Sequence, residues 1–284
     1  MIFDYNNGKK VAVLLGAGNM GTAIVRRVSQ GLTILLGDIS QKNLEKTSNE
    51  LRTSGYDVQT QVCDASDPAS MQRLAEKAAS LGEVKYFIDT AGASPSQASP
   101  EHILKLDLLG TAYALDIFGK VMARGGAGLV VSSMTGYMPC SLTPEEENEL
   151  RVTPTEQLKD LACLQHDRVT NPGEAYVVSK RANHLRVQSA AAGIWGERGA
   201  RVNSISPGIV LTPLAYDEFN ANGEGYQMMI HTSPARRVGT SDEIASAAAY
   251  LLSDGAAFVT GTDLLIDGGM IAAMKSGKFN IDIK

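Results

Sequence analysis

The chain has 284 residues, 44% of them hydrophobic and 20% charged, which is enough to bury a full core in one large domain. Its net charge is -5 and its lysines and arginines are scattered, which argues against nucleic acid as the main partner. No apolar run reaches the roughly 18 residues that a membrane span requires, and the N-terminus lacks a signal-peptide pattern, so we expect a cytoplasmic protein with no membrane partner.

Short apolar runs bounded by turn residues alternate with segments of helical period along almost the whole chain. The expected strands cover residues 11–15, 32–36, 58–62, 84–88, 128–133, 201–205 and 263–267. The expected helices cover residues 20–30, 41–53, 67–81, 100–122, 175–196 and 241–253. This alternation predicts an α/β fold, a doubly wound parallel sheet with helices on both faces and ligands at the carboxyl ends of the strands.

Two segments do not fit the alternation. Residues 137–174 are polar and acidic and contain four prolines, so we expect an insertion with one or two short helices of its own. Residues 212–236 are rich in loop signals and carry aromatic and methionine side chains, namely Tyr216, Phe219, Tyr226, Met228 and Met229. These side chains form either a lid over a substrate or the core contacts of a small helix pair.

A glycine-rich turn follows the first strand, in "VAVLLGAGNMGTAIVRRV". Gly16 permits a tight turn, Gly18 lets backbone amides approach a pyrophosphate, and Gly21 allows close helix packing at the helix N-terminus. A lone GxGxxG pattern is weak, but its place between a strand and an amphipathic helix predicts dinucleotide binding. The alternative is a glycine-rich turn without a ligand.

The second strand ends in "LLGDIS", where Asp38 lies 17 residues after Gly21. An acid at this place accepts hydrogen bonds from the adenosine ribose. It also repels a 2'-phosphate, by on the order of 4 kcal/mol for two like charges ~4 Å apart at an effective dielectric near 20. We therefore expect NAD in preference to NADP. The alternative is that Asp38 caps the next helix, with Ser40 sharing the role.

Other polar residues give weaker signals. Asp64, at the end of the third strand, either contacts adenine or caps the helix that starts near Asp67. Three cysteines without CxxC spacing indicate free thiols in a reducing compartment. Four histidines lie far apart without an HExxH pattern, so we expect no metal site. His184 is expected to be structural, because it lies two helical turns from Tyr176.

The stretch "NPGEAYVVSKRANHL" places Tyr176 four residues before Lys180, on one face of an expected helix. The same spacing occurs by chance at Tyr5 and Lys9, in an N-terminal tail where no helix is signalled. A free tyrosine has a pKa near 10, so a base active near neutral pH needs a shift of roughly three units, about 4 kcal/mol. A nearby ammonium supplies such a shift. The alternative is two helix-surface residues.

With these pieces in order, the chain resembles the short-chain dehydrogenase/reductase family over residues 10–269. The motifs that carry the resemblance are "IDTAG", "GLVVSSMTG", "AYVVSK", "SISPGIVLTP" and "RVGTSDEIASAAAYLLSDGAAFVTGTDLLIDGG". The resemblance implies a single Rossmann-like NAD(P)-binding domain over residues 1–284. It also implies a homodimer or homotetramer with a small-molecule alcohol or ketone as substrate.

The resemblance further implies hydride transfer between the nicotinamide and a carbonyl carbon, with Tyr176 as general acid and base. Lys180 would lower the pKa of the phenol and bind the nicotinamide ribose. Ser133, which matches the family's serine better than Ser132, would donate to the substrate oxygen; the alternative is ordinary strand-end hydrogen bonding. Cofactor contacts are implied for Gly16, Gly18, Asn19, Met20, Gly21, Asp38, Ile39, Asp64, Ala65, Ala91, Gly92, Tyr176, Lys180, Pro207, Gly208, Val210 and Thr212.

The sequence departs from the family pattern at several positions. Met20 and Thr22 replace glycines of the usual GxxxGxG turn, and Asp89 and Thr90 replace the usual Asn-Asn pair. Asp107 stands where the family has an asparagine that holds a proton-relay water. An aspartate can still hold that water and serve the relay, but it would pair with Lys180 and alter the titration. The alternative is an ordinary helix residue without a relay.

The insertion and the departures keep other functions open. Ser133 lies 43 residues before Tyr176, and extra sequence at this place also occurs in some hydroxysteroid dehydrogenases and carbonyl reductases, which favours hydrophobic alcohols and ketones. A redox-neutral epimerase or dehydratase acting on a nucleotide sugar is one alternative. A non-catalytic NAD-sensing regulator on the same fold is the other.

Overall fold

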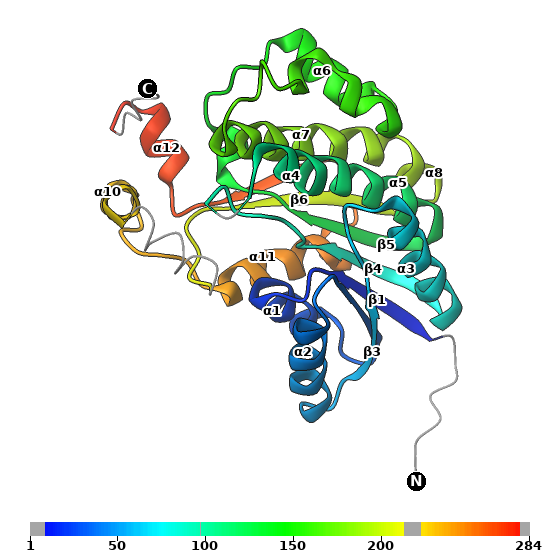
Figure 1. Cartoon of the computed structure of the whole chain (residues 1–284). Helices are drawn as coiled ribbons and strands as arrows, with labels where there is room; N and C mark the ends of the chain where they lie inside the picture. Colours follow the sequence, from blue (N-terminus) through cyan, green and yellow to red (C-terminus); the bar gives the residue numbers. More distant parts are fainter. Residues whose placement is uncertain (1–8, 97, 213–222, 279–284) are drawn as a thin grey trace.

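Seven parallel strands form one sheet between two layers of helices (Figure 1). The computed structural model describes residues 9–96, 98–212 and 223–278. The strands are β1 (Lys10–Leu15), β2 (Thr33–Asp38), β3 (Asp57–Val62), β4 (Glu83–Asp89), β5 (Met122–Val131), β6 (Arg201–Pro207) and β7 (Asp263–Ile266). Their order across the sheet is β3-β2-β1-β4-β5-β6-β7. The expected doubly wound sheet is confirmed.

The central strands are buried on both faces, which explains their continuous apolar runs. All six residues of β2 and five of the six residues of β1 are buried. The strand order reverses between β1 and β4, because β2 and β3 lie on one side of β1 and the later strands on the other. Ligands bind at such a switch point, outside the carboxyl ends of the strands.

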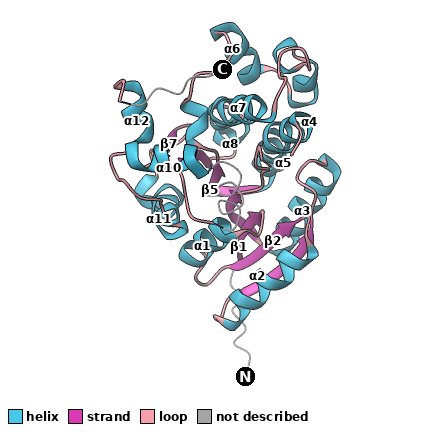
Figure 2. Cartoon of the chain, turned by 60° about the vertical axis from the view of Figure 1, so that its left-hand side comes forward, coloured by secondary structure: helices cyan, strands magenta, loops and turns pink. Residues whose placement is uncertain are grey.

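Helices cover both faces of the sheet (Figures 1 and 2). The helices are α1 (Asn19–Val28), α2 (Gln41–Thr53), α3 (Pro68–Leu81), α4 (Pro100–Ile103), α5 (Thr111–Val121), α6 (Pro144–Val152), α7 (Pro172–Ala192), α8 (Ile194–Glu197), α10 (Gly223–Thr232), α11 (Ser241–Leu252) and α12 (Met270–Lys275). One core cluster joins the sheet to α3, α5 and α7, and another joins it to α1, α2 and α11. The serine motif follows β5 and the Tyr-Lys motif lies on α7. This layering brings both motifs to the carboxyl ends of the strands, where the glycine turn also lies.

The helix expected over residues 100–122 is less regular than its apolar pattern predicts. Between α4 and α5 the chain forms a π-helical segment, Leu104–Gly110, whose wider turns contain Asp107. Single π-helical turns inside α-helices often occur at functional sites. The spacing of apolar residues does not distinguish such a wide turn from an α-helix, so the sequence pattern alone missed it.

The insertion at residues 137–174 contains α6 and short 3-10 turns, and it packs on α7 away from the sheet (Figure 1). Leu150, Leu158 and Cys163 of the insertion form an apolar cluster with Val178 and Ala182 of α7. The segment thus contains α6 and short 3-10 turns, and its description as an insertion stays a prediction.

One buried side chain, that of Arg186 on α7, fastens the insertion. Its guanidinium donates to the carbonyl oxygens of Leu150, Arg151 and Thr153 at 3.4, 3.2 and 2.6 Å. It also donates to the Thr155 hydroxyl at 2.9 Å. The insertion is thus held by hydrogen bonds as well as by apolar contacts.

The segment expected to form a lid is described only in part. Tyr216 and Phe219 lie outside the described residues. In α10, Met229 packs against a cluster that contains Met134 and Met270, whereas Met228 is 60% exposed. Both interpretations of this segment thus keep support, since α10 makes core contacts while Tyr226 lines the cavity described below.

The described residues also bear on the remaining expectations. Within residues 9–96, 98–212 and 223–278, none of the helices is long and apolar enough to cross a membrane. The same residues contain no group of three or more histidine, cysteine or acidic side chains able to hold a metal ion. All three cysteines have free thiols, and Cys63 and Cys163 are buried.

Candidate active site

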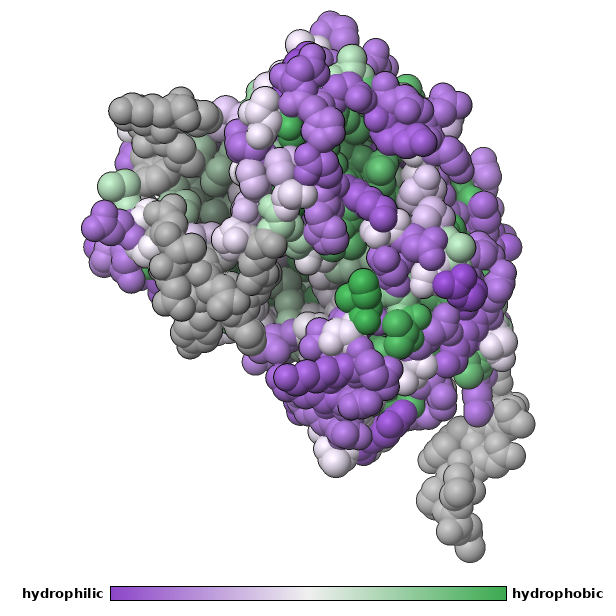
Figure 3. Space-filling view, in the orientation of Figure 1, coloured by the Kyte–Doolittle hydropathy of each residue, from purple (hydrophilic) through white to green (hydrophobic). Residues whose placement is uncertain are grey.

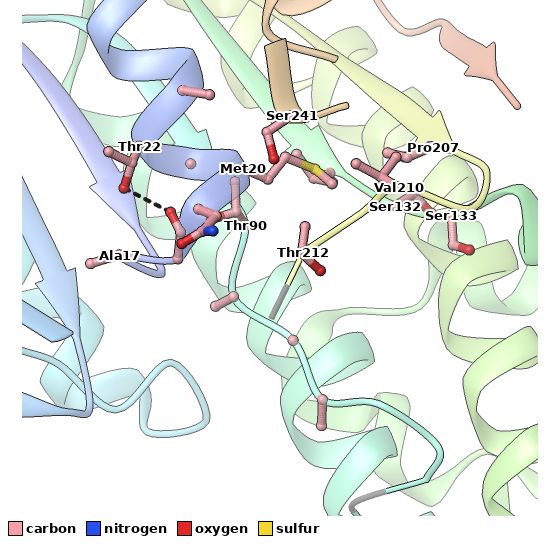
Figure 4. Close-up of a pocket in the computed structure, with 18 of the residues that line it drawn as sticks. Ala17, Met20, Thr22, Thr90, Ser132, Ser133, Pro207, Val210, Thr212 and Ser241 are labelled. Carbon is pink, nitrogen blue, oxygen red and sulfur yellow. Dashed lines mark hydrogen bonds between the residues drawn. The ribbon is translucent and has the colours of Figure 1, made fainter. Parts of the chain in front are cut away.

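A cavity of about 1150 Å³ opens at the carboxyl ends of the central strands (Figures 3 and 4). The residues expected in the site that line it are Gly18, Asn19, Met20, Gly21, Ala91, Gly92, Asp107, Ser133, Tyr176, Lys180, Pro207, Gly208, Val210 and Thr212. They come from the start of α1, from the loops after β1, β4, β5 and β6, from the π-helical segment and from α7. No residue of the insertion, which is described throughout, lines the cavity, so its presence gives no information on the substrate.

The glycine turn has the geometry that its sequence predicts. Gly16 has a φ of 89°, and a Cβ atom there would lie 2.7 Å from the Ala91 nitrogen. At Gly21 a Cβ atom would lie 2.7 Å from both Leu14 Cδ1 and Thr90 Oγ1, so α1 packs closely against β1 and β4. Both positions therefore require glycine for steric reasons.

Gly18, the middle glycine of the turn, has open space around it. No atom lies within 4 Å of a Cβ atom built there, and the residue begins α1 without a side-chain cap. The Thr22 hydroxyl donates to the Gly18 carbonyl at 2.8 Å and stabilises this first turn (Figure 4). The amides of the first helical turn, which have no partner inside a helix, thus face a cavity without side-chain obstruction, an arrangement that fits a pyrophosphate.

Asp38 supports the glycine turn from β2. One of its carboxylate oxygens accepts the Ala17 N–H at 2.7 Å, and the other accepts the Ser40 N–H at 2.8 Å. The helix cap itself is Ser40, whose hydroxyl accepts the Asn43 N–H at 3.2 Å. The alternative in which Asp38 is the cap is therefore wrong, although the two residues are bonded.

Five of the expected cofactor residues do not line the cavity. They are Gly16, Asp38, Ile39, Asp64 and Ala65. Asp64 does not cap α3, because that cap is Asp67, whose carboxylate accepts the Ala69 and Ser70 N–H groups. Instead, Asp64 Oδ1 accepts hydrogen bonds from the Ser66 backbone and hydroxyl at 2.8 Å each.

The end of β4 contributes two residues to which the sequence pattern had assigned no role. Thr90 donates its hydroxyl to the Gly16 carbonyl at 2.7 Å, which ties β4 to the glycine turn. Asp89 is 2% exposed and accepts the Ala91 N–H at 3.1 Å. Their place in "IDTAG", where the family has two asparagines, was the signal that could have identified them.

The two serines after β5 have different surroundings (Figure 4). Ser132 is 5% exposed and donates to the Lys180 carbonyl at 3.0 Å, so it fixes α7 against the strand. Ser133 lines the cavity, and its oxygen accepts the Thr135 N–H at 3.2 Å. In that bond the Ser133 oxygen is the acceptor, so the bond does not use the hydroxyl proton.

Tyr176 and Lys180 lie one turn apart on α7, which begins after the Asn171 cap. Both line the cavity, and the Lys180 ammonium nitrogen lies 5.1 Å from the centroid of the Tyr176 ring. A phenol beside an ammonium can give a proton to, or take one from, a ligand oxygen. The similar spacing at Tyr5 lies outside the described residues.

Asp107 forms a buried ion pair with Lys180. The Asp107 Oδ2 and Lys180 Nζ atoms are 2.8 Å apart, and Asp107 is fully buried. Burial by itself lowers the pKa of Lys180, but the charges of Asp107 and the Tyr176 phenolate outweigh it and hold the pKa above its usual range. Asp107 thus pairs with Lys180 as expected, whereas its role in a proton relay stays a prediction.

His184, the next polar residue along this face of α7, is buried away from the phenol. Its Nε2 lies 2.8 Å from the Ser206 hydroxyl and 3.4 Å from Asp263 Oδ1. Burial lowers the pKa of His184. The side chain therefore joins α7 to β6 and β7, which agrees with the expected structural role.

The motifs of this site define a class of enzyme, and comparison with known proteins agrees. The family described as short chain dehydrogenase matches residues 10–144, and the one described as enoyl-(acyl carrier protein) reductase matches residues 159–271. The chain belongs to the short-chain dehydrogenase/reductase family, whose members are oxidoreductases that bind NAD or NADP.

Individual relatives match nearly the whole chain. The short-chain dehydrogenase/reductase bsc3 of Alternaria brassicicola is 40% identical, over 92% of this chain and 95% of the relative. The D-threitol dehydrogenase of Mycolicibacterium smegmatis is 30% identical, over 94% of this chain and 95% of the relative. The solved short-chain dehydrogenase/reductase from Serratia marcescens has the same fold, with a TM-score of 0.72, 23% identity, and coverage of 93% of this chain and 98% of that chain.

Proposed function

We propose that the chain is an NAD-dependent dehydrogenase/reductase that transfers a hydride between the nicotinamide and a secondary alcohol or ketone. One observation carries this proposal: Tyr176, Ser133 and the glycine turn open into the same cavity, with Lys180 Nζ 5.1 Å from the phenol ring. A proton donor, a hydrogen-bond donor and a dinucleotide-sized groove are the parts that carbonyl reduction needs.

The chain's own residues divide the work as follows. The nicotinamide, when bound, supplies or accepts the hydride. Tyr176 gives its hydroxyl proton to the carbonyl oxygen in reduction, or takes the proton of the alcohol in oxidation. Ser133 donates a hydrogen bond to that same oxygen, where negative charge develops in the transition state. Lys180 places its ammonium beside the phenol and lines the adjoining part of the cavity.

The preference for NAD is proposed from Asp38. Its carboxylate lies at the end of β2, where it accepts the Ala17 and Ser40 N–H groups. Each oxygen of an ionised carboxylate has a second lone pair, which can accept a hydrogen bond from a ribose hydroxyl. A 2'-phosphate at that place would instead meet a like charge. Ile39, 68% exposed beside it, offers an apolar contact for adenine.

The cofactor proposal is tested with the variant Asp38→Asn, which removes the charge and keeps one acceptor oxygen, so that one of the two backbone N–H contacts is retained. We expect the wild type to have at least about tenfold higher kcat/KM with NADH than with NADPH, since ~1.4 kcal/mol corresponds to tenfold. The variant should lose most of this ratio. Equal or better turnover of the wild type with NADPH would refute the proposed preference.

The substrate is proposed to carry no charge near its carbonyl group. The cavity residues from the loops around Tyr176 include Ala93, Pro95, Met134 and Ile209, which are apolar. The charged residues on α1, α2 and α11 also line the cavity. These helices cover the face of the sheet opposite to α7, which carries Tyr176, so their charges belong to the other side of the cavity. The similarity to a D-threitol dehydrogenase makes polyols one class to test beside cyclic ketones.

The reaction type is tested by following the absorbance of the reduced nicotinamide with a panel of secondary alcohols, polyols, steroids and their ketones. Net oxidation of NADH with a ketone supports the proposal. Conversion of a nucleotide sugar without net change in NADH would support an epimerase or dehydratase instead. Binding of NADH without any turnover across the panel would support the regulator.

We also propose that the chain forms a homo-oligomer. Phe258 is fully exposed and Tyr250 is half exposed, and both lie close in sequence to the boundary between α11 and the edge strand β7. We propose that these two side chains contribute to the contact with another chain, as the residues of contiguous exposed apolar patches often do. Light scattering should give a dimer or tetramer mass for the wild type and a smaller mass for Phe258→Asp. A monomeric wild type would contradict this proposal.

A further inference from the structure

Two buried carboxyl groups lie near the buried ammonium of Lys180, and the three side chains come from three separate elements. Asp89 ends β4, Asp107 lies in the π-helical segment, and Lys180 is on α7. Their residues are 2%, 0% and 4% exposed. Asp107 and Lys180 are in direct contact at 2.8 Å. Asp89 is close enough for its charge to interact with both.

The hydrogen bonds of the two carboxyls do not require a negative charge. Asp107 Oδ1 accepts the Ala93 N–H at 2.8 Å, and Asp89 Oδ1 accepts the Ala91 N–H at 3.1 Å. The amide oxygen of an asparagine accepts such bonds equally well in geometry. Either residue type can therefore hold the shape of the loop after β4. What distinguishes aspartate here is its negative charge, which offsets the positive charge of Lys180.

The charges of the cluster cancel. Lys180 contributes one positive charge and Asp107 one negative charge, so the pair is neutral. Burial raises the pKa of Asp89 to about 7, although the Ala91 N–H and the charge of Lys180 oppose that rise. Above that pH, Asp89 adds a negative charge. An ammonium favours a nearby phenolate only to the extent that its charge is not offset by carboxylates.

The other charged groups near this cluster are few among the described residues. The pKa of Cys63, a thiol near the end of β3, is raised mainly by its burial and also by Asp64 and Asp89. Further along α7, Arg181 and His184 lie near Glu147 and Asp263, which balance them. Asp89 and Asp107 are therefore the carboxylates whose charges act on Lys180.

We propose that Asp89 and Asp107 cancel the positive charge of Lys180 and so keep Tyr176 in its protonated form at neutral pH, which makes the enzyme a carbonyl reductase near neutrality and an alcohol dehydrogenase only at alkaline pH. This inference rests on the proposed function. In the reduction, a C–H bond forms from the hydride of NADH, the π electrons of the carbonyl move to its oxygen, and that oxygen takes the Tyr176 proton. Solvent then returns a proton to the phenolate. The equilibrium constant is unaffected; the cluster determines the pH range of each direction.

The test compares pH profiles of kcat/KM for alcohol oxidation and ketone reduction in the wild type, Asp107→Asn and Asp89→Asn. A charge about 6 Å away at an effective dielectric near 20 shifts a pKa by about two units. We therefore expect Asp107→Asn to move the rising limb of alcohol oxidation to lower pH by about one to two units. The falling limb of ketone reduction should move in the same direction.

The variant Asp89→Asn gives a second and independent measurement, which also serves if Asp107→Asn does not fold. It should shift the same limb to lower pH by about one unit, because Asp89 is ionised in the alkaline range where oxidation occurs. The matched control is Asp57→Asn, whose carboxylate accepts the Thr33 hydroxyl at 2.6 Å at the opposite edge of the sheet. Its profile should equal that of the wild type.

The outcomes separate this inference from the proposed function. A wild type that reduces ketones, together with an unshifted limb in a folded Asp107→Asn or Asp89→Asn variant, overturns the inference and leaves the function standing. A shift to higher pH also overturns it. A wild type without turnover in either direction refutes the proposed function, and the inference fails with it.

Discussion

The two walls of the cavity present different chemical groups. The wall at the glycine turn presents backbone amides, and its shape depends on the missing side chains of Gly16, Gly18 and Gly21. The opposite wall presents side chains, with Lys180 and Asp107 paired in its interior. A backbone site is determined by local conformation. A charged site depends on what distant parts of the chain place beside each side chain.

The two walls also differ in which substitutions they tolerate. At the glycine turn, any side chain adds atoms, so the cost of a substitution is steric. In the charged cluster an aspartate and an asparagine have nearly the same shape, so the cost is electrostatic. Variants that change shape should therefore affect cofactor binding and stability, whereas variants that change charge should affect pH dependence.

The largest effect is expected at the charged wall, for Tyr176→Phe. Loss of the hydroxyl removes the proton donor, so kcat should fall by at least about 10²- to 10⁴-fold. NADH binding, measured by fluorescence titration, should stay within about threefold of the wild type because the ring remains. Full activity in this variant would remove Tyr176 from the mechanism.

The next effect concerns the glycine wall, where two neighbouring glycines should respond differently. Gly16→Ala should destabilise the fold by about 2–4 kcal/mol, since its φ is 89° and the added Cβ would lie 2.7 Å from the Ala91 nitrogen. Gly18→Ala meets no atom within 4 Å, so it should keep its stability and lose affinity for NADH.

The control for this pair is Gly31→Ala, which has a φ of 74° but open space around it. Its cost should be about 1–2 kcal/mol, from backbone conformation alone. Denaturant titration measures all three variants. If Gly16→Ala and Gly31→Ala cost the same, the close approach to Ala91 is not what requires glycine at the turn.

A smaller effect is expected for the insertion, which is remote from both walls. Arg186→Gln should leave carbonyl groups of the insertion without a donor and cost about 1–3 kcal/mol. Activity should stay within about twofold, since the insertion does not line the cavity. Arg168→Gln, which removes a partly exposed pair with Glu146, should cost clearly less than Arg186→Gln. Equal costs for the two variants would show that Arg186 does not anchor the insertion.

The last expected effect is a slope of stability against pH, which accumulates between the two pKa values of Asp89. The pKa of Asp89 is raised in the folded protein to about 7 from an ordinary value of 3.8, so the folded state holds a proton that the unfolded state releases between these values. The stabilisation is complete below pH 3.8 and is lost as the pH rises to 7. The slope is at most about 1.4 kcal/mol per pH unit.

The measurement is the free energy of unfolding from pH 4 to 8, for the wild type and for Asp89→Asn. The difference between the two should decrease steadily with pH up to about 7 and then level off. A constant difference over this range would show that Asp89 has the same pKa in the folded and unfolded states. That result would argue against the proposed part of Asp89 in offsetting the charge of Lys180.

Some features followed from local sequence alone. The strands, most helix boundaries and the glycine turn were predicted because their signals depend on neighbouring residues: apolar runs, caps such as Ser40 and Asp67, and the glycines after β1. The pairing of Tyr176 with Lys180 belongs to this group, since one helical turn brings them together. Membership of the family rests on these same local motifs.

Other features depended on the tertiary structure. Asp107 and Lys180 are far apart in the sequence, and only the family resemblance led us to expect their pairing. They meet because the π-helical segment packs against α7. The roles of Asp89 and Thr90, and the position of the insertion away from the cavity, were likewise determined by packing. Local patterns determine backbone conformation because its hydrogen bonds and steric contacts are short-range in sequence. Burial and charge balance are sums over neighbours from several elements, so only the folded chain determines them.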